Sequence, residues 1–281
     1  MTLHPAPIDA GIAFRRGDID VVIPASWRHL VDSSLCSTLA LGDARVATIE
    51  HLMAAFAGLE IDNALVELDG PEVPAMDGSA APFVFLLERT GLVVQDAPRR
   101  AIEVLKPVRV ADDGKSAALV PDDAFALSFA IEFAGTAMLR QRIDVVPDPE
   151  RFKREIARAR TFGFLEEVES MRAAGLARGG SLDNAVVLDN ASVLNPGGLR
   201  YPDELVRHKV LDALGDFVLA GVAVQAYVRM HRAGHELHSQ LLKAIFSSPD
   251  NYEIIDGSES QEALRLPQIS ALARQLVASV S

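Results

Sequence analysis

The chain has one cysteine, Cys36, among its 281 residues, so no disulfide can form within it. It has no apolar run of about 18 residues or more, the length that a helix needs to span a bilayer. No basic segment followed by an apolar one stands at the N-terminus, so we expect no secretory signal. Together these absences predict a cytoplasmic protein with no integral membrane segment.

Basic residues are also scarce, because 27 Lys and Arg face 39 Asp and Glu and the net charge is −12. No Lys/Arg cluster offsets this excess. Nucleic-acid binding requires a basic surface, so we predict no nucleic-acid partner. The net negative charge also argues against binding to an anionic membrane surface. A phosphorylated small substrate remains compatible with the sequence, because it needs only a few local cations.

The residues that are present suit a globular fold, with 49% apolar and 23% charged residues. Strand-like and helix-like runs are not regularly interleaved in either half, which favours an α+β class over a doubly wound parallel sheet. The polar stretch 95–100, which contains Pro98, predicts a boundary. We expect an N-terminal α+β domain at 1–96, a C-terminal α+β domain at 97–256 and a C-terminal tail at 257–281.

Local patterns also predict individual elements. Strands are expected at 20–23, 64–68, 102–105, 108–110, 116–120, 125–131, 185–188 and 222–228. Helices are expected at 48–56, 79–87, 149–159, 166–174 and 237–246, together with one that opens at Pro202 and contains 206–216.

Within that last helix, His208, Asp212 and Asp216 recur every four residues. At 3.6 residues per turn this spacing puts them on one face. An imidazole and a carboxylate at positions i and i+4 are the usual way for one helix to offer two ligands to a divalent metal ion. A solvated polar face on an amphipathic helix is the alternative, and the helix alone does not separate the two.

Glu50 and His51 form a second cluster, and on a helix adjacent side chains point about 100° apart. That arrangement suits His51 on a metal and Glu50 beside it on a water. A zinc amidase needs three protein ligands, an open fourth position and a carboxylate base, a list that His51, His208, Asp212 and Glu50 would fill. By itself, a Glu-His pair in a helix is more often on the surface.

A third cluster places His231, His235 and His238 within eight residues. We expect it in a loop between a strand and a helix, where catalytic groups are often placed. One of these histidines could be a general acid. For His231 and His238 we favour an exposed loop, whereas for His235 the spacing alone leaves the choice open.

Together these motifs closely resemble one family, the UDP-3-O-acyl-N-acetylglucosamine deacetylases (LpxC), which are zinc amidases of lipid A biosynthesis in Gram-negative bacteria. The resemblance runs from about Leu3 to Asp256 and rests on residues 48–55, 58–63, 76–83, 159–164, 179–181, 206–216 and 234–235. It implies two similar α+β domains, each a sheet packed on helices, with the active site between them. The implied reaction is hydrolysis of the N-acetyl amide of UDP-3-O-(3-hydroxyacyl)-N-acetylglucosamine, with release of acetate.

The resemblance also implies roles for single residues. His51, His208 and Asp212 would bind Zn²⁺, and Glu50 would be the general base that takes a proton from the attacking water. His235 would be a protonated acid, with Asp216 behind it to favour its charged form. Four further residues would act on the substrate: Lys209 as a nearby cation, Thr161 at the oxyanion, Phe162 beside the sugar ring and Arg232 facing the diphosphate.

Members of this family usually begin further upstream, with a first strand and a Gly-x-Gly-Leu-His-Ser-Gly-like motif, whereas this sequence starts at Met1-Thr2-Leu3. We therefore keep an alternative, in which the chain is an N-terminally truncated member that binds zinc or the UDP-sugar lipid with little or no turnover. An apolar passage for the acyl chain is expected near 176–188. We also expect a monomer.

Overall fold

The computed structural model describes residues 1–133, 139–173, 175, 179–190 and 192–256. Its α-helices are α1 (Glu50–Gly58), α2 (Ala81–Thr90), α3 (Pro149–Arg151), α4 (Leu165–Ala173), α5 (Glu204–Phe217) and α6 (His235–Ile245). A π-helical turn continues α3 over Phe152–Ile156, and 3-10 turns stand at Trp27–His29, Val218–Ala220 and Pro249–Asn251. No helix in these ranges is long and apolar enough to cross a membrane.

The N-terminal half contains a four-stranded sheet in the order β1-β7-β2-β3. Its strands are β1 (Thr2–Pro5), β2 (Ile12–Arg16), β3 (Val21–Pro24) and β7 (Ala64–Leu68). Burial alternates along β2 and β7, so one face of this sheet packs into the core. A smaller antiparallel sheet, β4-β5-β6, comprises Leu30–Asp32, Thr38–Leu41 and Ala44–Val46.

The C-terminal half is built on a five-stranded sheet in the order β12-β11-β17-β10-β9. These strands are β9 (Val108–Asp112), β10 (Lys115–Val120), β11 (Ala126–Glu132), β12 (Arg140–Val145) and β17 (Tyr227–His231). A sheet β16-β8-β18 adds Ala223–Gln225, Arg100–Val104 and Tyr252–Asp256, and a sheet β13-β14-β15 adds Phe162–Phe164, Val186–Asp189 and Ser192–Val193. Helices and several separate sheets confirm the α+β class.

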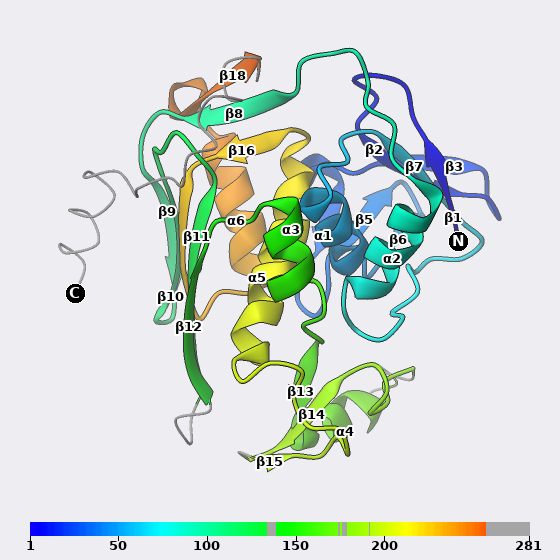
Figure 1. Ribbon diagram of the computed structural model, residues 1–281, viewed down its shortest axis with the longest axis vertical. Coiled ribbons are helices and arrows are strands. Elements are labelled where there is room, and N and C mark those ends of the chain that lie inside the picture. Colours follow the sequence, from blue (N-terminus) through cyan, green and yellow to red (C-terminus); the bar gives the residue numbers. More distant parts are fainter. Residues whose placement is uncertain (134–138, 174, 176–178, 191, 257–281) are drawn as a thin grey trace.

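Helices α1 and α5 lie side by side in the middle of the molecule, with α6 next to α5 (Figure 1). The approach of α1 to α5 is close because Gly215 has no side chain: a Cβ there would overlap the carbonyl oxygen of Glu50. Buried apolar side chains from both halves form one continuous cluster around these helices. The expected division at residue 96 into two similar domains therefore stays a prediction.

Several sequence predictions of local structure are wrong. The expected strand 222–228 is two strands, β16 and β17, which belong to different sheets, and an apolar run carries no signal for such a change of sheet. Helix α6 begins at His235, not at Leu237, and β17 extends to His231, so none of the three histidines of the third cluster lies in the expected loop. The helix expected to reach residue 159 ends its regular turns at Ile156. The C-terminal tail, 257–281, lies outside the described residues.

Candidate active site

The first turn of α1 carries Glu50 and His51 into the interior, where both are less than 10% exposed. The expectation that a Glu-His pair usually lies on the surface is therefore wrong here. The backbone N–H of Ser37 donates to Oε2 of Glu50 at 3.1 Å. Burial, reinforced by the nearby carboxylates of Asp216 and Asp212, raises the pKa of Glu50 to about 7.

Helix α5 presents His208, Asp212 and Asp216 to the same region, and each is at most 2% exposed. These three side chains therefore do not form the solvated face that was the alternative interpretation of their spacing. Nδ1 of His208 lies 3.0 Å from the carbonyl oxygen of Ala159. This contact holds the proton on Nδ1 and leaves Nε2 free as a ligand, which is how metal-binding histidines are commonly oriented.

His51, His208 and Asp212 offer ligand atoms that converge on one point. Oδ1 of Asp212 lies 3.2 Å from Nε2 of His208 and 3.8 Å from Nε2 of His51. Ligands about 2.1 Å from a tetrahedral ion stand about 3.4 Å apart, so these separations suit a shared metal. Oδ1 of Asp212 is also buried, and it has no hydrogen-bond partner among the residues that the structure describes. The donor set and this unpaired oxygen both fit a divalent ion.

The charge balance at these ligands also suits a metal. Burial lowers the pKa of His51 to about 3, with His208 as the next largest cause, so its imidazole is neutral and able to coordinate. Burial alone would raise the pKa of Asp212, but His208 and Lys209 outweigh it and hold that pKa well below the usual range. Lys209 donates to Oδ2 of Asp212 at 2.9 Å. His51 is therefore available to a metal as a neutral imidazole and Asp212 as a carboxylate.

Asp216 and His235 form a second pair beside this cluster. Nδ1 of His235, at the start of α6, lies 2.7 Å from Oδ2 of Asp216. Burial opposes the charged form of His235, but the charge and hydrogen bond of Asp216 outweigh it and raise the pKa of His235 to about 10. His235 is thus an imidazolium at neutral pH, and its Nε2 lies 3.9 Å from Asp212.

Thr161 and Phe162 stand on the segment that leads into β13. The N–H of Thr161 donates to the carbonyl oxygen of Gly78 at 2.8 Å, and Gly78 has a φ of +79° with no room for a Cβ against Asn184. The Phe162 ring lies edge-on to His208, with centroids 6.3 Å apart. The ammonium of Lys209 lies 5.4 Å from the centroid of the Phe162 ring. Phe162 and Lys209 therefore border the metal-capable cluster.

A cavity of about 270 Å³ opens next to His235. Its lining includes three cations, Lys115, Lys209 and Arg232, and the aromatic side chain of Phe133. Arg232 is exposed and has a φ of +52°, with its N–H bonded to the carbonyl oxygen of Ala130. The lining also includes three carboxylates, those of Asp112, Glu132 and Glu236, so the cavity presents charges of both signs and only its individual cations could contact an anionic substrate.

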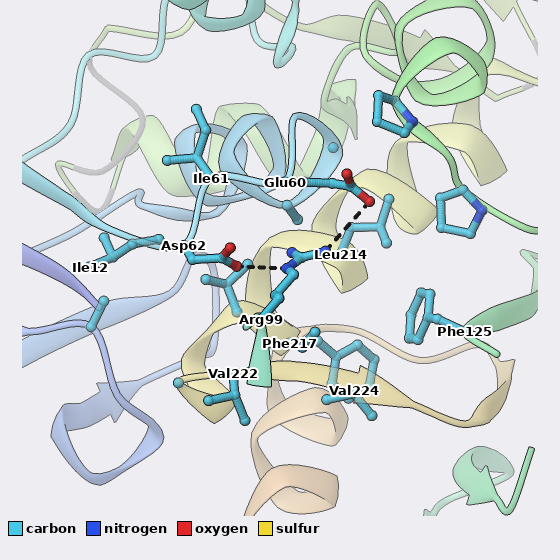
Figure 2. Close-up of a pocket in the computed structure, with 18 of the residues that line it drawn as sticks. Ile12, Glu60, Ile61, Asp62, Arg99, Phe125, Leu214, Phe217, Val222 and Val224 are labelled. Atoms are coloured by element: carbon cyan, nitrogen blue, oxygen red, sulfur yellow. Dashed lines mark hydrogen bonds and ion pairs between the residues drawn. The ribbon is translucent and has the colours of Figure 1, made fainter. Parts of the chain in front are cut away.

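A second cavity, of about 200 Å³, lies at the C-terminal ends of α1 and α5 (Figure 2). Its walls are mostly aliphatic and aromatic, including Leu214 and Phe217. The guanidinium of Arg99 is already engaged by Asp62 at 2.9 Å and by Glu60 at 3.5 Å (Figure 2). Among the described residues, none of Glu50, His235 and the metal-capable ligands lines this cavity, whereas His235 lines the first one, so we assign the chemistry to the first cavity.

Sequence reasoning missed three groups at the site. His238, expected in an exposed loop, is fully buried and lies 2.7 Å from Asp216. His238 follows His235 by three residues, a spacing that puts both side chains on one side of a helix. An expected helix that began at His235 instead of Leu237 would have indicated that His238 lies beside it. No local sequence pattern predicts the two other contacts. The hydroxyl of Ser37 donates to Asp216 at 2.6 Å, and Arg160 and Glu204 form a buried ion pair.

Glu204 anchors the segment before Thr161 to the start of α5. Its carboxylate, which is 0% exposed, accepts from the N–H, Nε and Nη2 of Arg160 and from the N–H of Arg200. Burial would raise the pKa of Glu204, but the bonds from Arg160 outweigh it and hold that pKa below the usual range. The pKa of Glu204 is lower in the folded protein than in the unfolded chain. The ion pair therefore stabilises the fold fully above the unfolded-state pKa, and this stabilisation is lost as the pH falls through the folded-state pKa.

We expect Glu204→Gln to lower the free energy of unfolding by about 3–5 kcal/mol at pH 7, because it leaves a buried guanidinium uncompensated. The difference from the unchanged protein should shrink as the pH falls below about 4.5, where Glu204 of the unfolded chain begins to take up a proton while the folded carboxylate, with its lower pKa, is still charged. Urea unfolding at several pH values measures both effects. Glu150→Gln, at an exposed pair with Lys153, is the matched control and should change little. A difference that is constant with pH would contradict this account of Glu204.

Comparison with known proteins places this geometry in a family. The family model described as "UDP-3-O-acyl N-acetylglycosamine deacetylase" (LpxC) matches residues 1–247. The chain is 48% identical over 267 residues to the UDP-3-O-acyl-N-acetylglucosamine deacetylase of Teredinibacter turnerae, covering 94% of this chain and 88% of that one. It is 49% identical over 257 residues to the same enzyme of Myxococcus xanthus, covering 91% and 82%. The chain therefore belongs to the UDP-3-O-acyl-N-acetylglucosamine deacetylase family.

Proposed function

We propose that this protein hydrolyses the N-acetyl amide of UDP-3-O-(3-hydroxyacyl)-N-acetylglucosamine, releasing acetate, as a zinc-dependent step of lipid A biosynthesis. The observation that carries the proposal is the burial of a base, an acid and three metal-capable ligands in one cluster on α1, α5 and α6. The relatives at 48–49% identity carry the name of this deacetylase.

His51, His208 and Asp212 are the residues that would hold the metal. A divalent ion bound there supplies Lewis acidity, which favours attack by water at neutral pH. Glu50 takes the proton of the attacking water as the new bond to the amide carbonyl carbon forms. Its raised pKa of about 7 suits this role, because a general base works best when its pKa is near the operating pH.

His235 supplies the proton that the leaving nitrogen needs. Cleavage of the C–N bond leaves an amine on the sugar, and Nε2 of His235 donates to that nitrogen while acetate departs. The Asp216 carboxylate keeps His235 protonated until then, as its short bond to Nδ1 indicates. Lys209 and Thr161 stabilise the charge that develops on the amide oxygen. Separate acid and base groups are what amide hydrolysis requires.

The substrate's anionic part fits the cavity beside His235. Arg232 and Lys209 line that cavity and would face the diphosphate, whereas Phe162 would lie against the glucosamine ring. The acyl chain would follow the segment around β13, β14 and α4, which projects from the body of the molecule (Figure 1). Residues 176–178 of the expected passage lie outside the part of the chain that the structure describes.

The alternative, binding without turnover, has no observation in its favour. The residues that a binding-only protein would not need, Glu50 and His235, are buried with the metal-capable ligands and have pKa values shifted toward catalytic roles.

Acetate release from the UDP-sugar lipid tests the proposal directly. The purified chain is stripped with a chelator, assayed, and assayed again after addition of about one equivalent of Zn²⁺ per chain. We expect no release from the stripped protein and recovery with zinc. A chain that binds zinc and releases no acetate would contradict the deacetylase proposal, whereas release from the fully stripped chain would contradict only the role of the metal.

A further inference from the structure

His238 is a buried titratable side chain that the proposed chemistry leaves unused. It lies in the first turn of α6, three residues after His235, so both rings project from one side of the helix. Its side chain is 0% exposed, and its ring centroid lies 6.3 Å from those of Phe129 and Phe217. A polar ring in such surroundings destabilises the fold unless it is hydrogen-bonded. The hydrogen-bond partner of the His238 side chain therefore indicates its role.

That partner is Asp216, which accepts hydrogen bonds from three side chains. Nδ1 of His235 and Nδ1 of His238 each lie 2.7 Å from the same oxygen, Oδ2. The hydroxyl of Ser37 donates to the other oxygen, Oδ1, at 2.6 Å. A carboxylate with donors on both oxygens stays ionised and is held in one orientation.

The surroundings of His238 determine which nitrogen carries its proton. Nδ1 faces a carboxylate oxygen and must carry a proton to bond it, whereas Nε2 is buried with no hydrogen-bond partner in the part of the chain that is described. Burial lowers the pKa of His238 and outweighs the opposing bond to Asp216; the charge of His235 lowers it further. His238 is therefore a donor in the Nδ1–H form, as the carboxylate at Nδ1 and the unpartnered Nε2 indicate.

We propose that His238 is a positioning residue whose Nδ1–H holds the Asp216 carboxylate in the orientation that directs Nε2 of His235 into the cavity. The inference rests on the proposed function, because it assigns His238 to the acid of that reaction. Without His238, the donor left on Oδ2 among the described residues is His235, the ring to be oriented, and Ser37 alone holds the other oxygen. The carboxylate is then freer to turn about its Cβ–Cγ bond, a torsion with broad minima. His238 acts through Asp216 and touches no reacting atom.

Two substitutions separate the hydrogen bond from the space that the ring fills. His238→Leu removes the donor and keeps much of the apolar volume, whereas His238→Asn places an amide N–H near the former position of Nδ1. We expect His238→Leu to lower kcat for acetate release by about 10- to 100-fold, the usual effect of losing a bond to a charged group, with KM and zinc content unchanged. His238→Asn should restore most of the loss. Equal loss in both variants, or none in His238→Leu, would overturn the proposal.

A double-mutant cycle tests whether His238 acts through Asp216. In an Asp216→Asn background the effect of His238→Leu on kcat should largely disappear, because the group being oriented is no longer the same acceptor. The same fold-loss in both backgrounds would mean that His238 has an independent role, which contradicts the proposal.

A measurement without turnover keeps the inference separate from the proposed function. Nitrogen-15 NMR of imidazole side chains distinguishes the two neutral forms and the imidazolium in the unchanged, metal-free chain. We expect His238 signals that show a proton on Nδ1. A His238 protonated at Nε2 alone would overturn the proposal even if the chain proved to be an active deacetylase. If the unchanged chain released no acetate, the proposed function would fail and this result would still decide the state of His238.

Discussion

Glu50→Gln is expected to lower kcat by about 10²- to 10⁴-fold, the usual contribution of a general base, while the protein keeps its metal. Glutamine has nearly the same shape, and its amide oxygen can still accept from the N–H of Ser37, which bonds Oε2 of Glu50 at 3.1 Å. The amide cannot take a proton from water. The substitution also removes a carboxylate that burial disfavours, so the fold should not be weakened by it.

The measurement is acetate release with zinc added, together with zinc analysis of each purified protein. Glu60→Gln is the matched control, because Glu60 follows α1, pairs with Arg99 and is more than half exposed. It makes the same carboxyl-to-amide change at the other end of α1 and should leave kcat unchanged. Turnover by Glu50→Gln within about tenfold of the unchanged protein would exclude Glu50 as the base.

His208→Ala should abolish both bound metal and turnover. His208 supplies Nε2 at 3.2 Å from Oδ1 of Asp212, and its removal leaves one imidazole and one carboxylate, fewer than the three protein ligands that catalytic zinc sites use. We expect zinc content to fall from about one ion per chain to near zero after dialysis, and acetate release to fall to background.

Unchanged zinc content in His208→Ala would show that the ligand set is wrong. His4→Ala is a suitable control, since His4 is an exposed histidine on β1 paired with Glu67 and lies outside the site. It should retain zinc and activity. Circular dichroism of each variant without metal distinguishes loss of the ligand from loss of the fold.

Local sequence patterns predicted the helix that carries His208. The spacing of His208, Asp212 and Asp216 predicted a helix with three groups on one face, and α5 has that form, because helical geometry repeats over a few neighbouring residues. The same local reasoning placed α1, α2 and the strands β8, β9, β10, β11 and β14 within a few residues, but it did not predict β12, β13, β15 and β18. The resemblance of the motifs predicted the family, which the comparisons confirm.

Local reasoning failed where a contact between distant segments decided the outcome. His238 reads as a loop residue in sequence, yet its burial follows from packing against Phe129 of β11 and Phe217 of α5. Residues 222–228 look like one strand, yet pairing with β8 at one end and with β10 and β11 at the other divides them. Pairing partners are chosen by the whole fold, so a single run of apolar residues cannot specify them.

The sequence by itself determined the fold class, the family and the residue types of the site, because these follow from short periodic patterns and from motifs with a fixed order. Only the tertiary structure decided that His51 meets His208, that Ser37 reaches Asp216 across 179 residues, and that Glu50 and His235 are buried together. Burial raises the pKa of Glu50 to about 7, whereas the charge and hydrogen bond of Asp216 outweigh the burial of His235 and raise its pKa to about 10. The base and the acid therefore acquire their working protonation states from contacts between α1, α5 and α6, which no local pattern contains.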